Sequence, residues 1–254
     1  MIIFNTDLDN TMIYSYKHDI GEDKICAEIY QGRQVSFVTR RTAELLKQVN
    51  EAVTLVPTTT RTLEQYVRID LGFGTPHYAL VCNGGVLLVN GVEDERWYKE
   101  SFERVEDCQR ELAKAEASLE KDENRSFEIR NISRLFLFTK SEKPQLSVER
   151  LQNTLDIDKM DVFYNGVKVY AVPKGLTKGI AVNRLREMLG ADLVISAGDS
   201  EFDVPLLNAA DAAIAPAGFP EPEKLTGSPI FMEGSGVFSE FVLEKVLDIA
   251  KRKG

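Results

Sequence analysis

The sequence is poor in the residues that stabilise secreted proteins or bind zinc, with three cysteines and two histidines among 254 residues. Cys26, Cys82 and Cys108 lie far apart and form no C-x-x-C pair, so we predict reduced thiols and neither a disulfide framework nor a zinc site. His18 and His77 have no potential nucleophile paired with them in the sequence, so we do not predict a catalytic histidine.

Long hydrophobic runs and an excess of positive charge are also missing. No apolar run approaches membrane-spanning length, and no basic segment precedes the apolar residues 1–4, so neither a membrane span nor a signal peptide is expected. The net charge of −9 and the isoelectric point near 5.0 argue against a general nucleic-acid binder, which needs a basic face. We expect a cytoplasmic monomer or homodimer.

Apolar runs that predict strands alternate with segments of helical periodicity, which is typical of a parallel α/β sheet. Strands are expected at residues 1–4, 52–60 and 77–85. Helices are expected at residues 41–49, with Thr42 as the N-cap, and at residues 61–72, closed by Gly72. The same alternation resumes at residue 175 and continues to the end of the chain.

The middle of the sequence has a different pattern. Asn90-Gly91 and Asn165-Gly166 separate apolar runs and predict β-hairpins, and a charged amphipathic helix is expected at residues 101–121. These features indicate an α+β insert with an antiparallel sheet. We therefore predict an α/β fold in which a Rossmann-like parallel-sheet core, residues 1–84 and 173–254, is interrupted by an α+β domain at residues 85–172.

Four polar clusters follow predicted strands of the core, where ligands bind in open α/β sheets. Two pairs of carboxylates at neighbouring strand ends would repel one another without a cation, and Mg²⁺ prefers such oxygen ligands. Hydroxyl groups and a lysine at strand-to-helix junctions suit a phosphate group. The pattern indicates metal-assisted phosphoryl transfer. The clusters are Asp7-Leu8-Asp9-Asn10-Thr11, Thr58-Thr59-Thr60-Arg61, Thr177-Lys178-Gly179 and the run from Gly198 to Asp203.

In this order the clusters resemble the four motifs of the haloacid dehalogenase (HAD) superfamily of phosphohydrolases, over essentially the whole chain. "DLDNT" is similar to the first motif of sucrose-phosphate phosphatases, and "CNGG" and "VPKGLTKG" resemble segments of the Cof-type group. The insert lies between the second and third motifs, which is the place of the type IIB cap domain in this superfamily.

The resemblance implies a role for each carboxylate. Asp7 would be the nucleophile that forms an aspartyl-phosphate, and Asp9 would be the general acid and then the general base. Residues two apart on a strand point to the same face, so both can address one phosphate. Mg²⁺ would be held by Asp7, the backbone carbonyl of Asp9, Asp199 and Asp203. In isolation, Asp199 and Asp203 would favour the simpler interpretation of helix N-terminal carboxylates that complement the dipole, but their position as a pair after a predicted strand favours metal binding.

The resemblance also implies phosphate ligands. Lys178 would neutralise both the phosphate and the nucleophile, and it is preferred to Lys174 because it opens a helix capped by Thr177. Thr59 would hydrogen-bond a phosphoryl oxygen, but the expected glycine is replaced by Thr60, so either hydroxyl could serve. Asn83 could orient the surroundings of the nucleophile or form a turn.

These residues predict a phosphatase, a Mg²⁺-dependent phosphomonoester hydrolase of a small phosphorylated metabolite. The resemblance favours a sugar phosphate. Two alternatives remain open: a phosphomutase of the phosphomannomutase type, and a non-catalytic protein that binds a phosphorylated ligand. Residues of the insert that could choose the substrate are Glu128, Arg130, Asn165 and Lys168.

Overall fold

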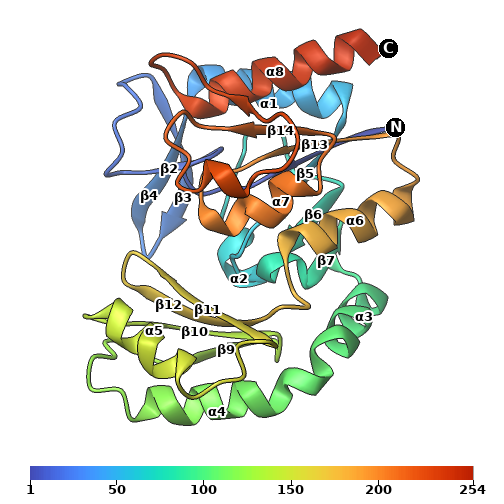
Figure 1. Cartoon of the computed structure of the whole chain (residues 1–254). Helices are drawn as coiled ribbons and strands as arrows, with labels where there is room; N and C mark the ends of the chain where they lie inside the picture. Colours follow the sequence, from blue (N-terminus) through green and yellow to red (C-terminus); the bar gives the residue numbers. More distant parts are fainter. Residues whose placement is uncertain (254) are drawn as a thin grey trace. The chain divides into compact units, whose positions relative to one another are not determined.

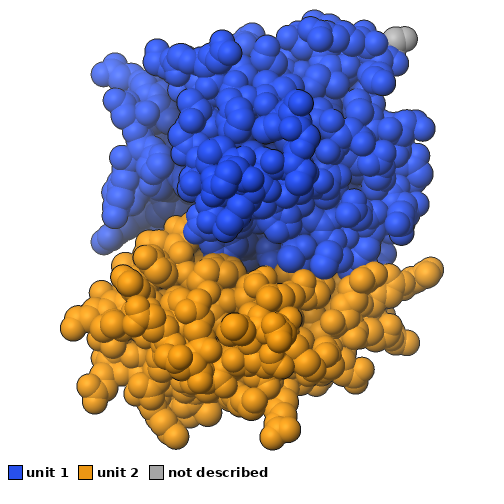
Figure 2. Space-filling model, viewed as in Figure 1, with its two compact units in different colours: residues 1–94, 177–254 blue, residues 95–176 orange. Residues whose placement is uncertain are grey.

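The computed structural model describes residues 1–253 (Figure 1). It forms two compact units, coloured separately in Figure 2: Met1–Asp94 with Thr177–Gly254, and Glu95–Leu176. The first junction lies ten residues beyond the predicted boundary of 84/85. The reason is that β7 (Val86–Val89) and β8 (Val92–Glu93) form one antiparallel sheet with β6 (Tyr78–Val81), so the hairpin belongs with the first unit.

The first unit is built on a parallel sheet of five strands in the order β15-β14-β13-β1-β5. Four of the five residues of β1 are buried, as expected of a strand covered on both faces. The predicted fold class is confirmed. The strands are β1 (Ile2–Thr6), β5 (Thr54–Pro57), β13 (Leu193–Ala197), β14 (Ala212–Ala215) and β15 (Ile230–Phe231).

Helices cover both faces of this sheet. Figure 1 shows α1 (Arg40–Ala52) beside α8 (Phe238–Lys253) on one face, with α6 (Lys178–Leu189) and α7 (Val204–Asn208) on the other. The predicted cap of α1 was wrong. Thr39 is the N-cap, and its side-chain oxygen accepts a 2.9 Å hydrogen bond from the backbone N–H of Thr42, which is already the third helical residue.

The helix predicted at residues 61–72 is much shorter than expected. Only Leu63–Tyr66 forms α2, which begins at a capping box between Thr62 and Gln65. The chain then leaves the helix because Ile69 bridges to Glu28 and the N–H of Asp70 donates to the carbonyl of Ala27. Pairing with a neighbouring strand therefore outweighs helix propensity here.

Residues 14–39 form an antiparallel sheet that the sequence analysis did not assign. Its strands are β2 (Tyr14–Ser15), β3 (Lys24–Tyr30) and β4 (Arg33–Thr39), in the order β2-β4-β3. The predicted hairpin between β7 and β8 is confirmed, with Asn90 and Gly91 both at positive φ.

The second unit, Glu95–Leu176, has an antiparallel sheet in the order β11-β12-β10-β9. Leu137, Val169 and Ala171 share one hydrophobic cluster with residues of α4 and α5. The single helix predicted at residues 101–121 is broken by a short 3₁₀ turn at Glu106–Cys108. The elements are α3 (Glu95–Val105), α4 (Gln109–Glu120), β9 (Arg130–Ile132), β10 (Phe136–Lys140), α5 (Pro144–Gln152), β11 (Met160–Asn165) and β12 (Lys168–Pro173). Within the described part of the chain, none of the helices is long and apolar enough for a membrane span.

Candidate active site

Asp7 directly follows β1, an interior strand of the sheet that lies between β13 and β5. Its backbone N–H donates 2.9 Å to the carbonyl of Ala197, so the pairing of β1 with β13 continues through this residue. Asp7 is buried at 7% exposure, whereas about half of the Asp9 side chain is exposed. The two predicted catalytic carboxylates therefore lie at the carboxyl end of the sheet in different environments.

Lys178 is presented by the first turn of α6. Thr177 caps that helix as predicted, accepting from the N–H of Ile180. The buried Lys178 ammonium donates to Asp7 Oδ1 at 2.5 Å and to Asp203 Oδ1 at 2.6 Å. Gly179 is required beside it, because a Cβ atom there would overlap the carbonyl oxygen of Pro205 in α7.

Asp203 and Asp199 come from the loop after β13. The second oxygen of Asp203 accepts hydrogen bonds from the backbone N–H of Asp199 and from both donors of Ser200, at 3.0–3.1 Å. Gly198 makes room for this turn, since a Cβ atom there would overlap the Asp203 side chain. Asp203 is fully buried and holds the loop that carries Asp199.

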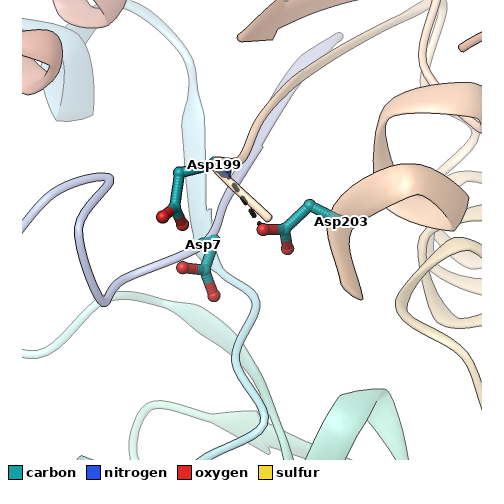
Figure 3. A group of neighbouring side chains, drawn as sticks. All are labelled: Asp7, Asp199 and Asp203. Carbon is teal, nitrogen blue, oxygen red and sulfur yellow. Dashed lines mark hydrogen bonds between the residues drawn. The ribbon is translucent and has the colours of Figure 1, made fainter. Parts of the chain in front are cut away.

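Oxygens of Asp7, Asp199 and Asp203 all lie within 4.8 Å of one another (Figure 3). When all three carboxylates are ionised, they and the ammonium of Lys178 carry a net charge of −3 + 1 = −2. Burial, followed by the charge of Asp203, raises the pKa of Asp199 to about 7. Burial also raises the pKa of Asp7, despite the opposing effect of Lys178. A cluster of oxygen donors with this excess charge fits a divalent cation such as Mg²⁺.

The segment after β5 carries the predicted threonines. The N–H of Thr58 donates to the carbonyl of Thr6 at 2.7 Å, so this segment lies next to the end of β1. Thr59 is buried and Thr60 is half-buried. Asn83, at φ 59°, donates its backbone N–H to the carbonyl of Thr59 at 2.9 Å. This hydrogen bond from the backbone of Asn83 thus stabilises the segment that carries Thr59.

Arg61 contacts the site and Glu28 contacts Arg61, and the sequence analysis gave neither residue a role. Arg61 donates to both oxygens of Asp9, and it also donates to Glu28 in β3. Arg61 follows the predicted threonines directly, so its position could have indicated a contact. Glu28 had no such signal, because β3 itself was not predicted.

Comparison with known proteins gives the family. The sequence profile of the haloacid dehalogenase-like hydrolases matches residues 77–218, more than half of the chain, so the protein belongs to this family. It is therefore a hydrolase by family, as predicted. A search of curated protein sequences finds no match.

Solved structures share the fold of this chain. The sucrose-phosphatase of Synechocystis sp. PCC6803 has a TM-score of 0.62 at 17% identity, with 97% of each chain covered. The HAD subclass IIB sugar phosphatase BT4131 has a TM-score of 0.61 at 12% identity, with 98% of each chain covered. BT1666 from Bacteroides thetaiotaomicron, from a study of HAD phosphatases, has a TM-score of 0.56 at 12% identity, covering 99% of this chain and 95% of that chain. At these identities the likeness is one of fold, and it matches the predicted core with an inserted cap domain.

Proposed function

We propose that this protein is a Mg²⁺-dependent phosphomonoester hydrolase that forms an aspartyl-phosphate on Asp7. The observation that carries the proposal is the buried contact of Lys178 with both Asp7 and Asp203, beside Asp199. The proposed nucleophile Asp7, the ammonium group of Lys178 and the carboxylates of Asp199 and Asp203 lie together at the end of the parallel sheet, where α/β enzymes bind ligands.

In the first step, the carboxylate of Asp7 attacks the phosphorus atom and the bond to the leaving alcohol breaks. Asp9 supplies the proton that the alcohol needs, and then accepts a proton from the water that hydrolyses the aspartyl-phosphate. Lys178 holds Asp7 in place and balances part of the negative charge of the phosphoryl group.

Asp7, Asp199 and the backbone carbonyl of Asp9 would hold the metal, with Asp203 acting directly or through the loop that it organises. A bound Mg²⁺ supplies positive charge that stabilises the phosphoryl oxygens and lets Asp7 and Asp199 ionise. Thr59 or Thr60 would donate to a phosphoryl oxygen, and Asn83 would brace that segment.

The proposed substrate is a small sugar phosphate. The support is that two proteins with the same fold carry names that refer to sugar phosphates, a sucrose-phosphatase and a subclass IIB sugar phosphatase. Glu128 and Arg130, which form an ion pair, and Asn165 and Lys168, which are paired in β11 and β12, remain the candidates for substrate choice.

Phosphate release from a panel of sugar phosphates and other small phosphate esters tests the proposal, with Mg²⁺ and then with EDTA. We expect release that needs Mg²⁺ and is lost in Asp7→Asn and Asp9→Asn. Conversion of a sugar phosphate into its isomer without phosphate release would instead show a phosphomutase. Binding of the esters by folded protein without any conversion would show a non-catalytic role.

A further inference from the structure

Arg61 donates two hydrogen bonds to Asp9, the proposed acid/base residue. Its Nε donates to Asp9 Oδ2 at 2.8 Å, and its Nη2 donates to Asp9 Oδ1 at 2.7 Å. A guanidinium group that bonds both oxygens of a carboxylate fixes the plane as well as the position of that carboxylate. Lysine cannot reproduce this geometry, because its ammonium is a single point of charge.

Arg61 is itself held from the other side. Its Nη1 donates to Glu28 Oε2 at 2.9 Å and reaches the carbonyl of Gln65 at 3.5 Å. Only 13% of the Arg61 side chain is exposed, and Glu28 is buried at 4%. Because the buried guanidinium of Arg61 is bonded to both Asp9 and Glu28, it has little freedom to rotate away from Asp9. The contact with Glu28 in β3 therefore helps to fix the position of Asp9.

Glu28 is anchored in turn by residues that do not touch Asp9. Arg68 donates to Glu28 Oε1 at 3.1 Å and lies over the ring of Tyr30, and Ser36 donates to Glu28 Oε2 at 2.9 Å. Substitution of Arg68 therefore perturbs Glu28 without removing either bond between Arg61 and Asp9, which makes Arg68 a matched control.

From this chain of contacts, and resting on the proposed function, we infer that Arg61 is a positioning residue, anchored by Glu28, that aligns Asp9 for hydrolysis of the aspartyl-phosphate. Both oxygens of Asp9 accept N–H bonds from Arg61, and this contact favours the ionised carboxylate, which is the form that accepts a proton. Arg61 therefore supports the proton-accepting step more than the proton-donating step.

The step that depends on Arg61 is the hydrolysis of the aspartyl-phosphate. Asp9 takes a proton from a water molecule while the water oxygen forms a bond to phosphorus. The bond between phosphorus and the Asp7 oxygen breaks, which restores the Asp7 carboxylate and gives inorganic phosphate, and Asp9 then returns its proton to solvent. Loss of Arg61 should slow this step and leave the phosphoryl group on Asp7 for longer.

An aryl phosphate such as p-nitrophenyl phosphate isolates this step, because its leaving group departs without a proton. With Mg²⁺ present, the experiment measures kcat and, after acid quench in the steady state, the fraction of enzyme that carries a phosphoryl group by intact mass. In Arg61→Met we expect kcat to fall about 10- to 100-fold while the phosphorylated fraction rises above that of wild type.

Three further variants complete the test. Arg61→Lys and Glu28→Gln should change both quantities in the same direction as Arg61→Met, by smaller amounts, and they guard against a variant that fails to fold. Arg68→Gln keeps both bonds between Arg61 and Asp9, so it should raise the phosphorylated fraction less than Arg61→Lys or Glu28→Gln does. Circular dichroism and thermal melting confirm that each variant is folded.

A fall in kcat without a rise in the phosphorylated fraction would overturn the inference, because the slowed step would then be the first one or the loss would be structural. An unchanged kcat in folded Arg61→Met would overturn it as well. If the wild-type protein shows neither turnover nor phosphorylation, the proposed function itself fails, and this outcome is distinct from a defect confined to the variants.

Discussion

The ammonium of Lys178 lies 2.5 Å from Oδ1 of Asp7, joining the start of α6 to the end of β1 across 171 residues of sequence. Both side chains are buried, and burial penalises each charge. The carboxylates of Asp203 and Asp7 nevertheless raise the pKa of Lys178, so it stays charged at neutral pH. We therefore expect this ion pair to contribute both to the stability of the first unit and to the proposed reaction.

Lys178→Met should destabilise the protein by about 3 kcal/mol, because Asp7 and Asp203 would be left buried without their shared cation. Urea unfolding measures the change in free energy. Lys174→Met is the matched control, since Lys174 is half-exposed and forms only a 3.9 Å ion pair with Asp161, so a change within about 0.5 kcal/mol is expected. Equal losses for both variants would be inconsistent with the role of Lys178.

Gly179→Ala should reduce both stability and phosphate release. The added Cβ atom would overlap the carbonyl oxygen of Pro205, and relief of that overlap must move the first turn of α6, which carries Lys178. We expect a loss of about 1–3 kcal/mol in unfolding free energy. Gly218→Ala has no heavy atom within 4 Å and should be tolerated. A Gly179→Ala protein as stable and active as Gly218→Ala would contradict this packing.

Mg²⁺ binding should weaken as the pH falls below about 7, since protons compete with the metal for Asp199, whose pKa is raised to about 7. Without metal, the proton on Asp199 contributes stability that is fully present below its usual pKa of 3.8 and is lost as the pH rises through about 7. The rise in melting temperature on adding Mg²⁺ should therefore be larger at pH 8 than at pH 6.

Asp199→Asn provides the control for that pH dependence, because its amide does not titrate. The Mg²⁺-induced rise in melting temperature should be smaller in this variant and should vary less between pH 6 and pH 8. A rise that is the same at both pH values in the wild-type protein would argue against Asp199 as a metal ligand.

Cys82 should resist alkylation in the folded protein. Burial raises the pKa of its thiol to about 12, and only 3% of the residue is exposed. The thiolate that reacts with iodoacetamide is therefore scarce at pH 8. Peptide mapping after brief treatment should find Cys26, which is half-buried, modified before Cys82. Modification of Cys82 first would show that the turn after β6 is open.

The sheet that carries the site could be predicted because its strands are apolar runs followed by polar residues. Asp7 and Lys178 could be connected from sequence because Asp7 directly follows a strand and Lys178 opens a helix, and residues at such positions meet at the carboxyl edge of the sheet. The structure places Asp7, Lys178, Asp199 and Asp203 together, and their catalytic and metal-binding roles stay predictions.

Tertiary pairing accounts for what could not be predicted. The run at residues 61–72 has a helical pattern, yet the pairing of Ile69 and Asp70 with β3 ends α2 after Tyr66. The role of Glu28 could not be seen either, since its importance depends on Arg61, which approaches it from 33 positions later in the chain. Such contacts have no local signature in composition or periodicity.

The most direct test of the account is to locate the phosphoryl group. The protein is mixed with Mg²⁺ and a phosphate ester that it hydrolyses, quenched in acid, digested and mapped by mass spectrometry. We predict one added phosphoryl group on the peptide that contains Asp7, absent in Asp7→Asn and absent when EDTA replaces Mg²⁺. Phosphate release by the wild-type protein with no modification of that peptide, or undiminished release by Asp7→Asn, would contradict the proposed mechanism.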